Sequence, residues 1–196
     1  MKNILIAVLM VFIGANFACA ERAFIERVVD GNTLKLLDGQ YVKLIGIDQP
    51  QYASDSQEPL SQSQTDKIAA ADKEKAAFIR SLVSGSVVEL EYDAQKQDAQ
   101  GNLLAYVWFE FESNEKGAVP DNYDLYLVDR NDGSKGAIVF LNSTMIKSGY
   151  AKPVQEAVNT KHAQLFQKIY EDRSGQMKMA QADANPILQA SLEKAQ

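Results

Sequence analysis

The sequence contains one cysteine and one histidine, which removes several kinds of chemistry from consideration. The cysteine, Cys19, lies in a predicted leader, so the chain after it has no disulfide, no thiol nucleophile and no cysteine-ligated metal site. A histidine without a serine or cysteine partner motif does not make a catalytic triad, and we expect His162 to lie on the surface. Packing alone must therefore hold the folded chain together.

The chain also has fewer basic than acidic residues. The chain has 20 Lys and Arg residues against 26 Asp and Glu, with a formal net charge of −6, and no cluster of Lys and Arg stands out. Proteins that bind phosphate backbones usually present a basic face, because the release of counterions supplies most of their sequence-independent affinity. A net negative body repels such a polyanion at long range. We therefore expect nucleic acid binding to be weak at best, and the sequence names no other partner.

Long hydrophobic runs are absent except near the N-terminus, where Lys2 is followed by the apolar run Ile4–Ile13. The tripeptide Ala18-Cys19-Ala20 then provides the small-x-small pattern that signal peptidase recognises, with Glu21 as the first residue of the mature chain. These features predict a signal peptide over residues 1–20. The protein is therefore predicted to be exported, either to a periplasm or to the extracellular medium.

Two alternatives exist for this segment. A transmembrane anchor needs about 20 apolar residues to cross a bilayer, and the run is shorter, so we expect no transmembrane segment in the mature chain. Cys19 could instead be acylated, as in a lipoprotein. That modification usually requires an aliphatic residue three positions before the cysteine, where this chain has Asn16. Lipid attachment is therefore the less favoured alternative.

Residues 21–182 have the pattern of one domain of ordinary size. Tight turns are predicted at Asp30-Gly31 and Asp38-Gly39, and a helix is predicted over residues 65–83, where apolar residues recur at helical spacing. Together these elements predict an α+β fold, a five-stranded OB-type β-barrel with about three helices. The five predicted strands are Phe24–Val29, Thr33–Leu37, Tyr41–Ile47, Val87–Tyr92 and Leu103–Phe111.

The chain continues beyond these five strands. Residues 112–135 are a polar stretch around the β-like run Tyr123–Val128, which we interpret as an extra loop or hairpin within the domain. Two helices are predicted after it, at Asn142–Ser148 and Lys161–Met179. Residues 183–196 are expected to form a polar C-terminal tail.

Several short segments occur in an order and at a spacing typical of a known family. They are VVDGNT at 28–33, VKLIGIDQPQ at 42–51, GNLLAYV at 101–107, LNS at 141–143 and KSGYAK at 147–152. With these segments the chain resembles the staphylococcal nuclease (thermonuclease) family over roughly residues 24–180, apart from 112–135. The resemblance implies an OB-fold barrel with three helices, in agreement with the pattern of strands and helices.

Members of that family cleave phosphodiesters with calcium, and the resemblance assigns roles to five positions. Two carboxylates hold the metal, and this chain has Asn32 and Asp48 at their positions. A glutamate that handles the attacking water is replaced by Gln51. Two arginines that neutralise the phosphate are replaced by Lys43, which keeps the charge without the planar fork, and by Asn102. Of the five positions, Asp48 keeps the family's charged group, and Lys43 keeps the positive charge but not the guanidinium. The other three residues are neutral.

Magnitudes indicate what these replacements do. Calcium takes roughly six to eight oxygen ligands, so one carboxylate with one amide should hold it weakly. Loss of a general base costs about 10²–10⁴ in rate, and loss of one preorganised charge stabiliser costs about 10²–10³. The sequence therefore favours an exported nuclease-like domain without efficient nuclease activity, which acts as a binding or scaffold module. It predicts no cofactor for that module, and calcium if any activity remains.

The alternative is an enzyme. A weak or modified phosphodiesterase that still uses calcium and acts on DNA or RNA would need other carboxylates in place of those that are missing. Asp55 and Glu58, in the polar loop after the third predicted strand, are the candidates for that role.

Some residues also have ordinary structural interpretations. Asp30-Gly31 is expected to form a turn for geometric reasons, and Asp48 either caps the loop backbone or keeps a vestigial metal role. One of Tyr106 and Trp108 is expected to fill the barrel core. Four carboxylates lack the spacing of a calcium loop and are expected to form a solvated acidic loop: Asp121, Asp124, Asp129 and Asp132.

Overall fold

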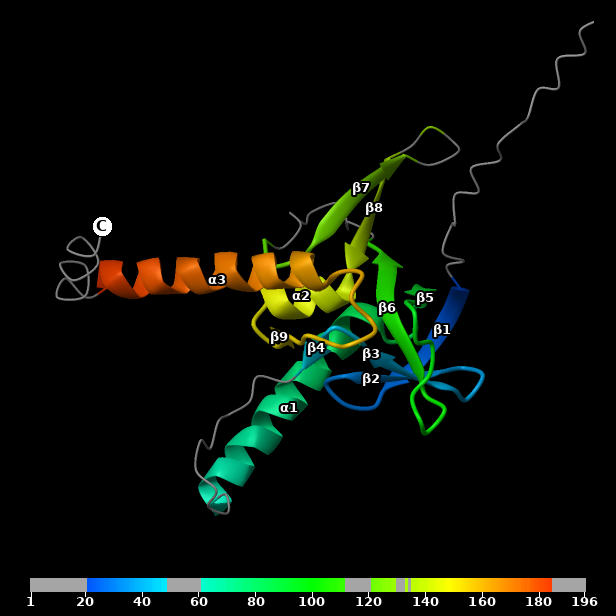
Figure 1. The fold of residues 1–196 in the computed structure, drawn as a ribbon, viewed down its shortest axis with the longest axis horizontal. Helices are drawn as coiled ribbons and strands as arrows, with labels where there is room; N and C mark the ends of the chain where they lie inside the picture. The colour runs from blue at the N-terminus through cyan, green and yellow to red at the C-terminus, as the bar shows by residue number, and fades with distance from the viewer. Residues whose placement is uncertain (1–20, 49–60, 112–120, 130–132, 134, 185–196) are drawn as a thin grey trace, which may run out of the picture.

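The computed structural model of the chain describes residues 21–48, 61–111, 121–129, 133 and 135–184. Figure 1 shows a curved sheet with helices packed around it. The elements in chain order are β1 (Glu21–Val28), β2 (Thr33–Leu36), β3 (Tyr41–Leu44), β4 (Ile47–Asp48), α1 (Gln62–Val83), β5 (Val87–Glu91), β6 (Leu103–Glu110), β7 (Leu125–Asp129), β8 (Lys135–Phe140), α2 (Leu141–Lys147), β9 (Lys152–Pro153) and α3 (Ala163–Ala184).

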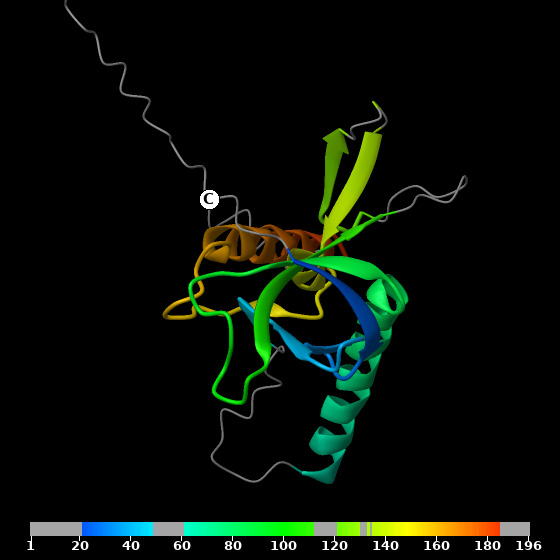
Figure 2. The ribbon, with the colours of Figure 1, turned by 90° about the vertical axis from the view of Figure 1, so that its right-hand side faces the viewer.

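Five of these strands close into a barrel. Their order is β3-β2-β1-β5-β6, and a parallel pairing of β3 with β6 joins the two ends. In that pairing Val42 lies opposite Leu103 and Leu44 lies opposite Ala105. Figure 2 shows the strands curving around a common centre. This closed arrangement, with the three helices, confirms the predicted five-stranded OB-type barrel. Closure leaves no edge strand within the barrel.

Alternation along the strands builds the barrel core. Ile25, Leu34, Val42 and Leu90 are all 0% exposed, and successive strand residues point to opposite faces of a sheet. Helix α1 adds buried apolar side chains to the same core, among them Ile79. Burying each such side chain stabilises the fold by about 1.5–3 kcal/mol, so packing does supply the stability of a chain without disulfides.

The same core continues between β6 and the helices α2 and α3. Tyr106 is fully buried there, with ring centroids 6.1 Å from Phe140 and 6.0 Å from Phe166. Trp108, two residues along the same strand face, stacks on Phe140 at 4.0 Å. Tyr106 is thus the fully buried member of the predicted pair. It belongs to the same buried cluster as the barrel residues and lies on the helix-covered face of β6, which residues 106 and 108 share.

The helices follow the predicted pattern with shifted ends. Helix α1 begins three residues earlier than predicted because Ser61 caps it: Ser61 Oγ accepts from Gln64 N at 3.3 Å, and Ser61 N donates to Gln64 Oε1 at 2.8 Å. Helix α3 continues to Ala184, past the predicted end of the domain at 182. Among the residues that the structure describes, no helix is both long and apolar enough to span a bilayer.

The predicted extra stretch contributes a hairpin. Strands β7 and β8 pair antiparallel, with Leu125 opposite Val139, and β8 pairs with β6, so the hairpin extends the barrel sheet (Figure 1). Asp124, at its base, was expected to be solvated, and this was wrong. Its Oδ2 accepts from Tyr126 OH at 3.1 Å and from Ser143 Oγ, and its backbone N donates to Thr144 Oγ1 at 3.0 Å.

The reason for this difference is that Asp124 lies where the hairpin meets the first turn of α2. Asp121 is exposed, as expected, and Asp132 lies outside the described residues. The carboxylates of this stretch therefore do not form one solvated loop.

The expectation that His162 lies on the surface was also wrong. Its side chain is 18% exposed, its Nε2 lies 3.1 Å from Glu91 Oε2, and its ring packs edge-on against Tyr106 at 4.5 Å. The loop before α3 is tied to the barrel here, because Asp93 Oδ2 accepts from Lys161 N at 2.9 Å. His162 therefore links the loop to β5 and β6.

Glu91 is expected to make the stability of this junction depend on pH. Burial raises its pKa, but hydrogen bonds from His162, Lys161 and Trp108 outweigh burial and lower the pKa from 4.5 to about 2. Because the folded-state pKa lies below the unfolded value, the stabilisation is complete above about pH 5 and is lost as the pH falls toward 2.

Glu91→Gln should therefore lower the free energy of unfolding at pH 7 by up to about 3 kcal/mol, and by much less near pH 2.5. Urea unfolding followed by the fluorescence of Trp108 at both values measures this. Glu89→Gln, on the same strand with an exposed side chain, is the matched control and should have little effect at either pH. An equal loss for Glu91→Gln at pH 7 and pH 2.5 would contradict the interpretation.

Candidate functional site

Four of the five positions that the family resemblance singles out lie in the described residues, at one end of the barrel. Asn32 precedes β2, Lys43 lies in β3, Asp48 ends β4 and Asn102 precedes β6. The fifth, Gln51, lies outside the described residues, as do Asp55 and Glu58. The structure therefore brings together the positions of the metal and the phosphate from segments up to 70 residues apart in sequence.

The turn between β1 and β2 places Asn32. Val29 N donates to Thr33 O at 2.9 Å, and Asp30 Oδ1 accepts from Asn32 N at 2.7 Å. This confirms the structural interpretation of Asp30-Gly31 as a turn. Asn32 O accepts from Leu44 N at 3.0 Å, which ties the turn to the end of β3.

Gly46 shapes the segment between β3 and β4. Its φ is +74°, and a Cβ at this position would lie 2.6 Å from Phe166 Cε2. Its backbone N donates to Glu156 Oε1 at 2.7 Å. Only glycine allows this conformation and this approach without strain, so the backbone can pass over Phe166 and carry Asp48 to the end of the barrel.

The two phosphate positions both engage a carboxylate of the chain itself. Lys43 Nζ lies 2.7 Å from Asp98 Oδ2, and Asn102 Nδ2 donates to the same oxygen at 2.8 Å. The backbone N atoms of Asn102 and Gln100 donate to Asp98 Oδ1 at 2.9 and 3.0 Å. The hydrogen bonds from Lys43 and Asn102 hold the pKa of Asp98 far below its usual range. Asp98 is therefore an ionised internal anion at the place where a phosphate would be expected.

The pattern of residues did not single out Asp98 beyond its place in a turn. Lys43 and Asp98 meet only because β3 pairs in parallel with β6, whose start follows the turn at residue 98. The sequence did contain a signal for this contact. Asp98 is the only charged residue in the turn that leads to Asn102, and it lies four residues before Asn102.

Removing this internal anion should increase affinity for a polyanion. The unmodified protein is expected to bind single-stranded DNA more weakly than about micromolar at 0.15 M salt, in the range of ordinary non-specific binding. Asp98→Asn frees Lys43, so we expect a gain of a few fold and an increase of about one in the slope of log affinity against log salt. Fluorescence anisotropy with a labelled oligonucleotide measures both. Asp38→Asn is the control for the change in net charge, and an equal gain there would contradict the role of Lys43.

The two metal positions differ in burial. Asn32 Oδ1 is buried and accepts no hydrogen bond from the residues that the structure describes, whereas Asp48 is exposed and lies opposite Lys152 in the short β4–β9 pairing. Buried polar atoms are normally satisfied, so an unpaired one points to a feature that the hydrogen-bond pattern does not explain.

A lysine that sequence reasoning missed lies beside them. Lys75, on α1, is 3% exposed, and its aliphatic stem crosses Gly31, where a Cβ would lie 2.5 Å from Lys75 Cδ. Its Nζ is buried and finds no hydrogen-bond acceptor in the described part of the chain. Burial lowers the pKa of Lys75, while Asp72, Asp48 and Asp30 act in the opposite direction. The helical spacing that makes residues 68, 79 and 82 apolar also places residue 75 on the buried face, and this was the available signal.

The donor set does not fit calcium. Calcium takes roughly six to eight oxygens, with affinity set by the number of charged ligands, whereas the two metal positions offer one amide and one carboxylate, with a buried lysine nearby. No group of three or more His, Cys, Asp and Glu side chains that could hold a metal ion occurs within the described residues. The described residues at these positions therefore do not by themselves form a calcium site.

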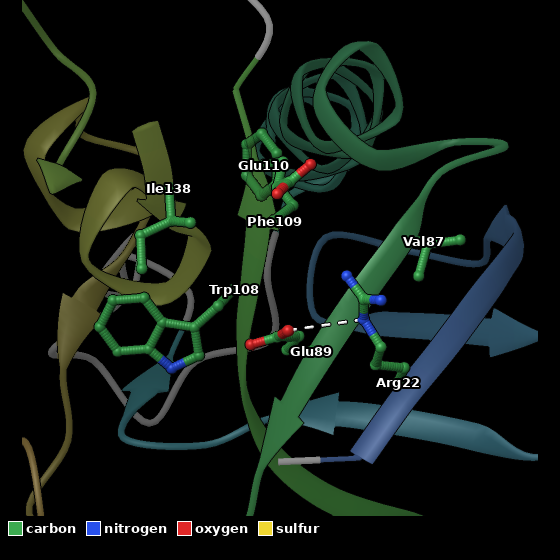
Figure 3. Close-up of a pocket in the computed structure, with 7 residues that line it drawn as sticks. All are labelled: Arg22, Val87, Glu89, Trp108, Phe109, Glu110 and Ile138. Carbon is green, nitrogen blue, oxygen red and sulfur yellow. Dashed lines mark ion pairs between the residues drawn. The ribbon is translucent and has the colours of Figure 1, made fainter. Parts of the chain in front are cut away.

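A separate groove lies on the outer face of the sheet and contributes none of these groups. Figure 3 shows it between the Arg22–Glu89 ion pair and the ring of Trp108. Arg22 Nε lies 3.5 Å from Glu89 Oε1, and both side chains are well exposed. No residue of the site described above lines the groove. Its lining holds one cation, Arg22, and the carboxylates of Glu89 and Glu110, and we assign it no chemistry.

The closed five-stranded barrel and the three helices, with the family's positions Asn32, Lys43, Asp48 and Asn102, define a nuclease-fold protein. The chain matches the family described as "Staphylococcal nuclease homologue" over residues 41–179. It belongs to the staphylococcal nuclease family.

Relatives of known name agree with this assignment. The chain is similar to "Thermonuclease" of Staphylococcus hyicus, with 34% identity over 94 residues, which are 46% of this chain and 50% of that protein. It is 35% identical over 91 residues to "Thermonuclease" of Staphylococcus intermedius, which are 45% of this chain and 49% of that protein. The chain thus spans about half the length of the curated relatives it matches.

Proposed function

We propose that this chain is an exported nuclease-fold module that does not cleave phosphodiesters efficiently and acts by binding or scaffolding. The observation that carries the proposal is the engagement of both phosphate positions by Asp98. Lys43 and Asn102 are held by an internal carboxylate at 2.7 and 2.8 Å, and a substrate phosphate would have to displace it. The metal positions support the same conclusion, since one of the two is the neutral Asn32 and a buried lysine, Lys75, lies against the neighbouring Gly31.

The typical cost of each missing group indicates how large the loss of cleavage rate should be. Each missing preorganised charge costs about 10²–10³ in rate, and a missing general base costs about 10²–10⁴. These effects are not additive, because the groups of such a site act as a unit. Even partial compounding leaves little catalysis.

Purified residues 21–196 should therefore cleave single-stranded DNA and RNA at least about 10³-fold more slowly than an active thermonuclease such as that of Staphylococcus hyicus. Cleavage is measured with fluorogenic DNA and RNA substrates, with calcium and with a chelator. A rate within about tenfold of the thermonuclease that the chelator abolishes would overturn the proposal.

The second candidate is a weak or modified phosphodiesterase that uses calcium and acts on DNA or RNA. Asp48 favours it, since it is the one charged metal position that the chain retains. In this alternative Asp55 or Glu58 completes the site, so Asp55→Asn and Glu58→Gln should abolish whatever chelator-sensitive cleavage is measured. Residual cleavage that neither substitution changes would count against it.

A further inference from the structure

The buried lysine beside the metal positions is the feature that the proposed function leaves unexplained. Lysine is almost never fully buried unless it is paired, yet Lys75 is 3% exposed and its Nζ has no hydrogen-bond acceptor in the described residues. The stem is held firmly, because it lies against the backbone of Gly31. Its position is therefore determined by packing and not by chance contact of a mobile surface chain.

Three carboxylates act electrostatically on Lys75, and they come from three segments. Asp30 lies in the turn between β1 and β2, Asp48 ends β4, and Asp72 lies one turn earlier on α1. Asn32, with its unsatisfied Oδ1, follows Gly31 directly. Two of these residues, Asn32 and Asp48, hold the positions that the family resemblance assigns to the metal.

We infer that the side chain of Lys75 supplies, from within the chain, the positive charge that a bound divalent cation would supply at these positions. The lysine offsets the carboxylates of Asp72, Asp48 and Asp30. It also excludes calcium, because a divalent cation at the same place would face a fixed like charge in a partly desolvated site. The end of the barrel is thereby ordered without metal.

This inference does not depend on whether the chain cleaves phosphodiesters. The question is whether the Lys75 ammonium or a bound calcium ion balances the acidic residues. Measurements of thermal stability and calcium binding answer it, and a nuclease assay does not. The proposed function could fail, with cleavage through another route, while Lys75 still excludes calcium. Conversely, an inactive protein could bind calcium without lysine having any part in the site.

A double-mutant cycle between Asn32→Asp and Lys75→Met tests the inference. Methionine keeps most of the stem that packs on Gly31 and removes the charge. We expect Asn32→Asp to lower the melting temperature by at least about 3 °C more in the Lys75→Met background than beside the native lysine, because only the lysine balances the new carboxylate. Lys73→Met, with an exposed side chain on the same helix, is the matched control and should show no coupling.

Calcium is the second arm of the experiment. Unmodified protein and Asn32→Asp should show no calcium-dependent rise in melting temperature. The double variant should gain about 5 °C or more when calcium is about 100-fold above its dissociation constant, which calorimetric titration measures. If the double variant does not fold alone, refolding with calcium but not with magnesium at equal ionic strength gives the same support.

Three results would overturn the inference. The first is a calcium-dependent rise in the unmodified protein, and the second is equal calcium binding by Asn32→Asp with and without the lysine. The third is the absence of coupling between positions 32 and 75 in a double variant that folds but ignores calcium.

Discussion

Replacing Asn142 with alanine should lower the free energy of unfolding by about 3 kcal/mol. Asn142 is 0% exposed, its Nδ2 donates to Ile45 O at 2.9 Å, and its Oδ1 accepts from Val107 N at 2.9 Å. One side chain therefore joins α2 to β6 and to the segment that leads from β3 to β4. Alanine would leave both backbone groups buried without partners, and each such group costs about 1–3 kcal/mol.

Urea unfolding at pH 7, followed by Trp108 fluorescence and by circular dichroism, measures this loss. Asn122→Ala is the matched control, because Asn122 is only partly buried and donates to Ser148 Oγ at 3.0 Å. We expect a loss below about 1 kcal/mol there. A loss of similar size at both positions would show that the two buried hydrogen bonds of Asn142 do not stabilise the fold more than a partly exposed hydrogen bond does.

The largest expected gain in function comes from rebuilding the charged site while removing the lysine. Asn32→Asp, Lys43→Arg, Gln51→Glu and Asn102→Arg restore a metal carboxylate, a forked phosphate clamp, a base and a second clamp. Together with Lys75→Met, they should raise calcium-dependent cleavage by about 10²–10⁴ over the unmodified protein. Single reversions should change the rate little, because the groups act as a unit.

The lysine makes the comparison with the fourfold variant informative. The four reversions without Lys75→Met should give little cleavage, since the internal cation still occupies the site. Melting temperature with and without calcium is measured beside the cleavage rate. A fivefold variant that gains stability with calcium but does not cleave would mean that the groove has lost its catalytic shape, and a fully active fourfold variant would show that the lysine is no obstacle.

Local patterns predicted the barrel because they are the direct consequence of strand and helix geometry. Alternating apolar residues in β1, β2 and β3 and the Asp-Gly turns between them depend on neighbours within a few positions. The ends of helices were less well predicted: α1 begins at Gln62 because of a cap at Ser61, and α3 extends to Ala184. Caps and tertiary contacts move such boundaries by a few residues.

The amino-acid sequence by itself determined which charges the site has lost, since the neutral residues at 32, 51 and 102 are visible without coordinates. Only the tertiary structure decided what the remaining polar groups do. Asp98 meets Lys43 across 55 residues, and His162 meets Glu91 across 71. Lys75 is buried because α1 packs over the turn at Gly31. The physical reason is that the burial and the charge partners of a polar side chain depend on segments distant in the chain. The local periodicity of a segment does not predict which distant segments will contact it.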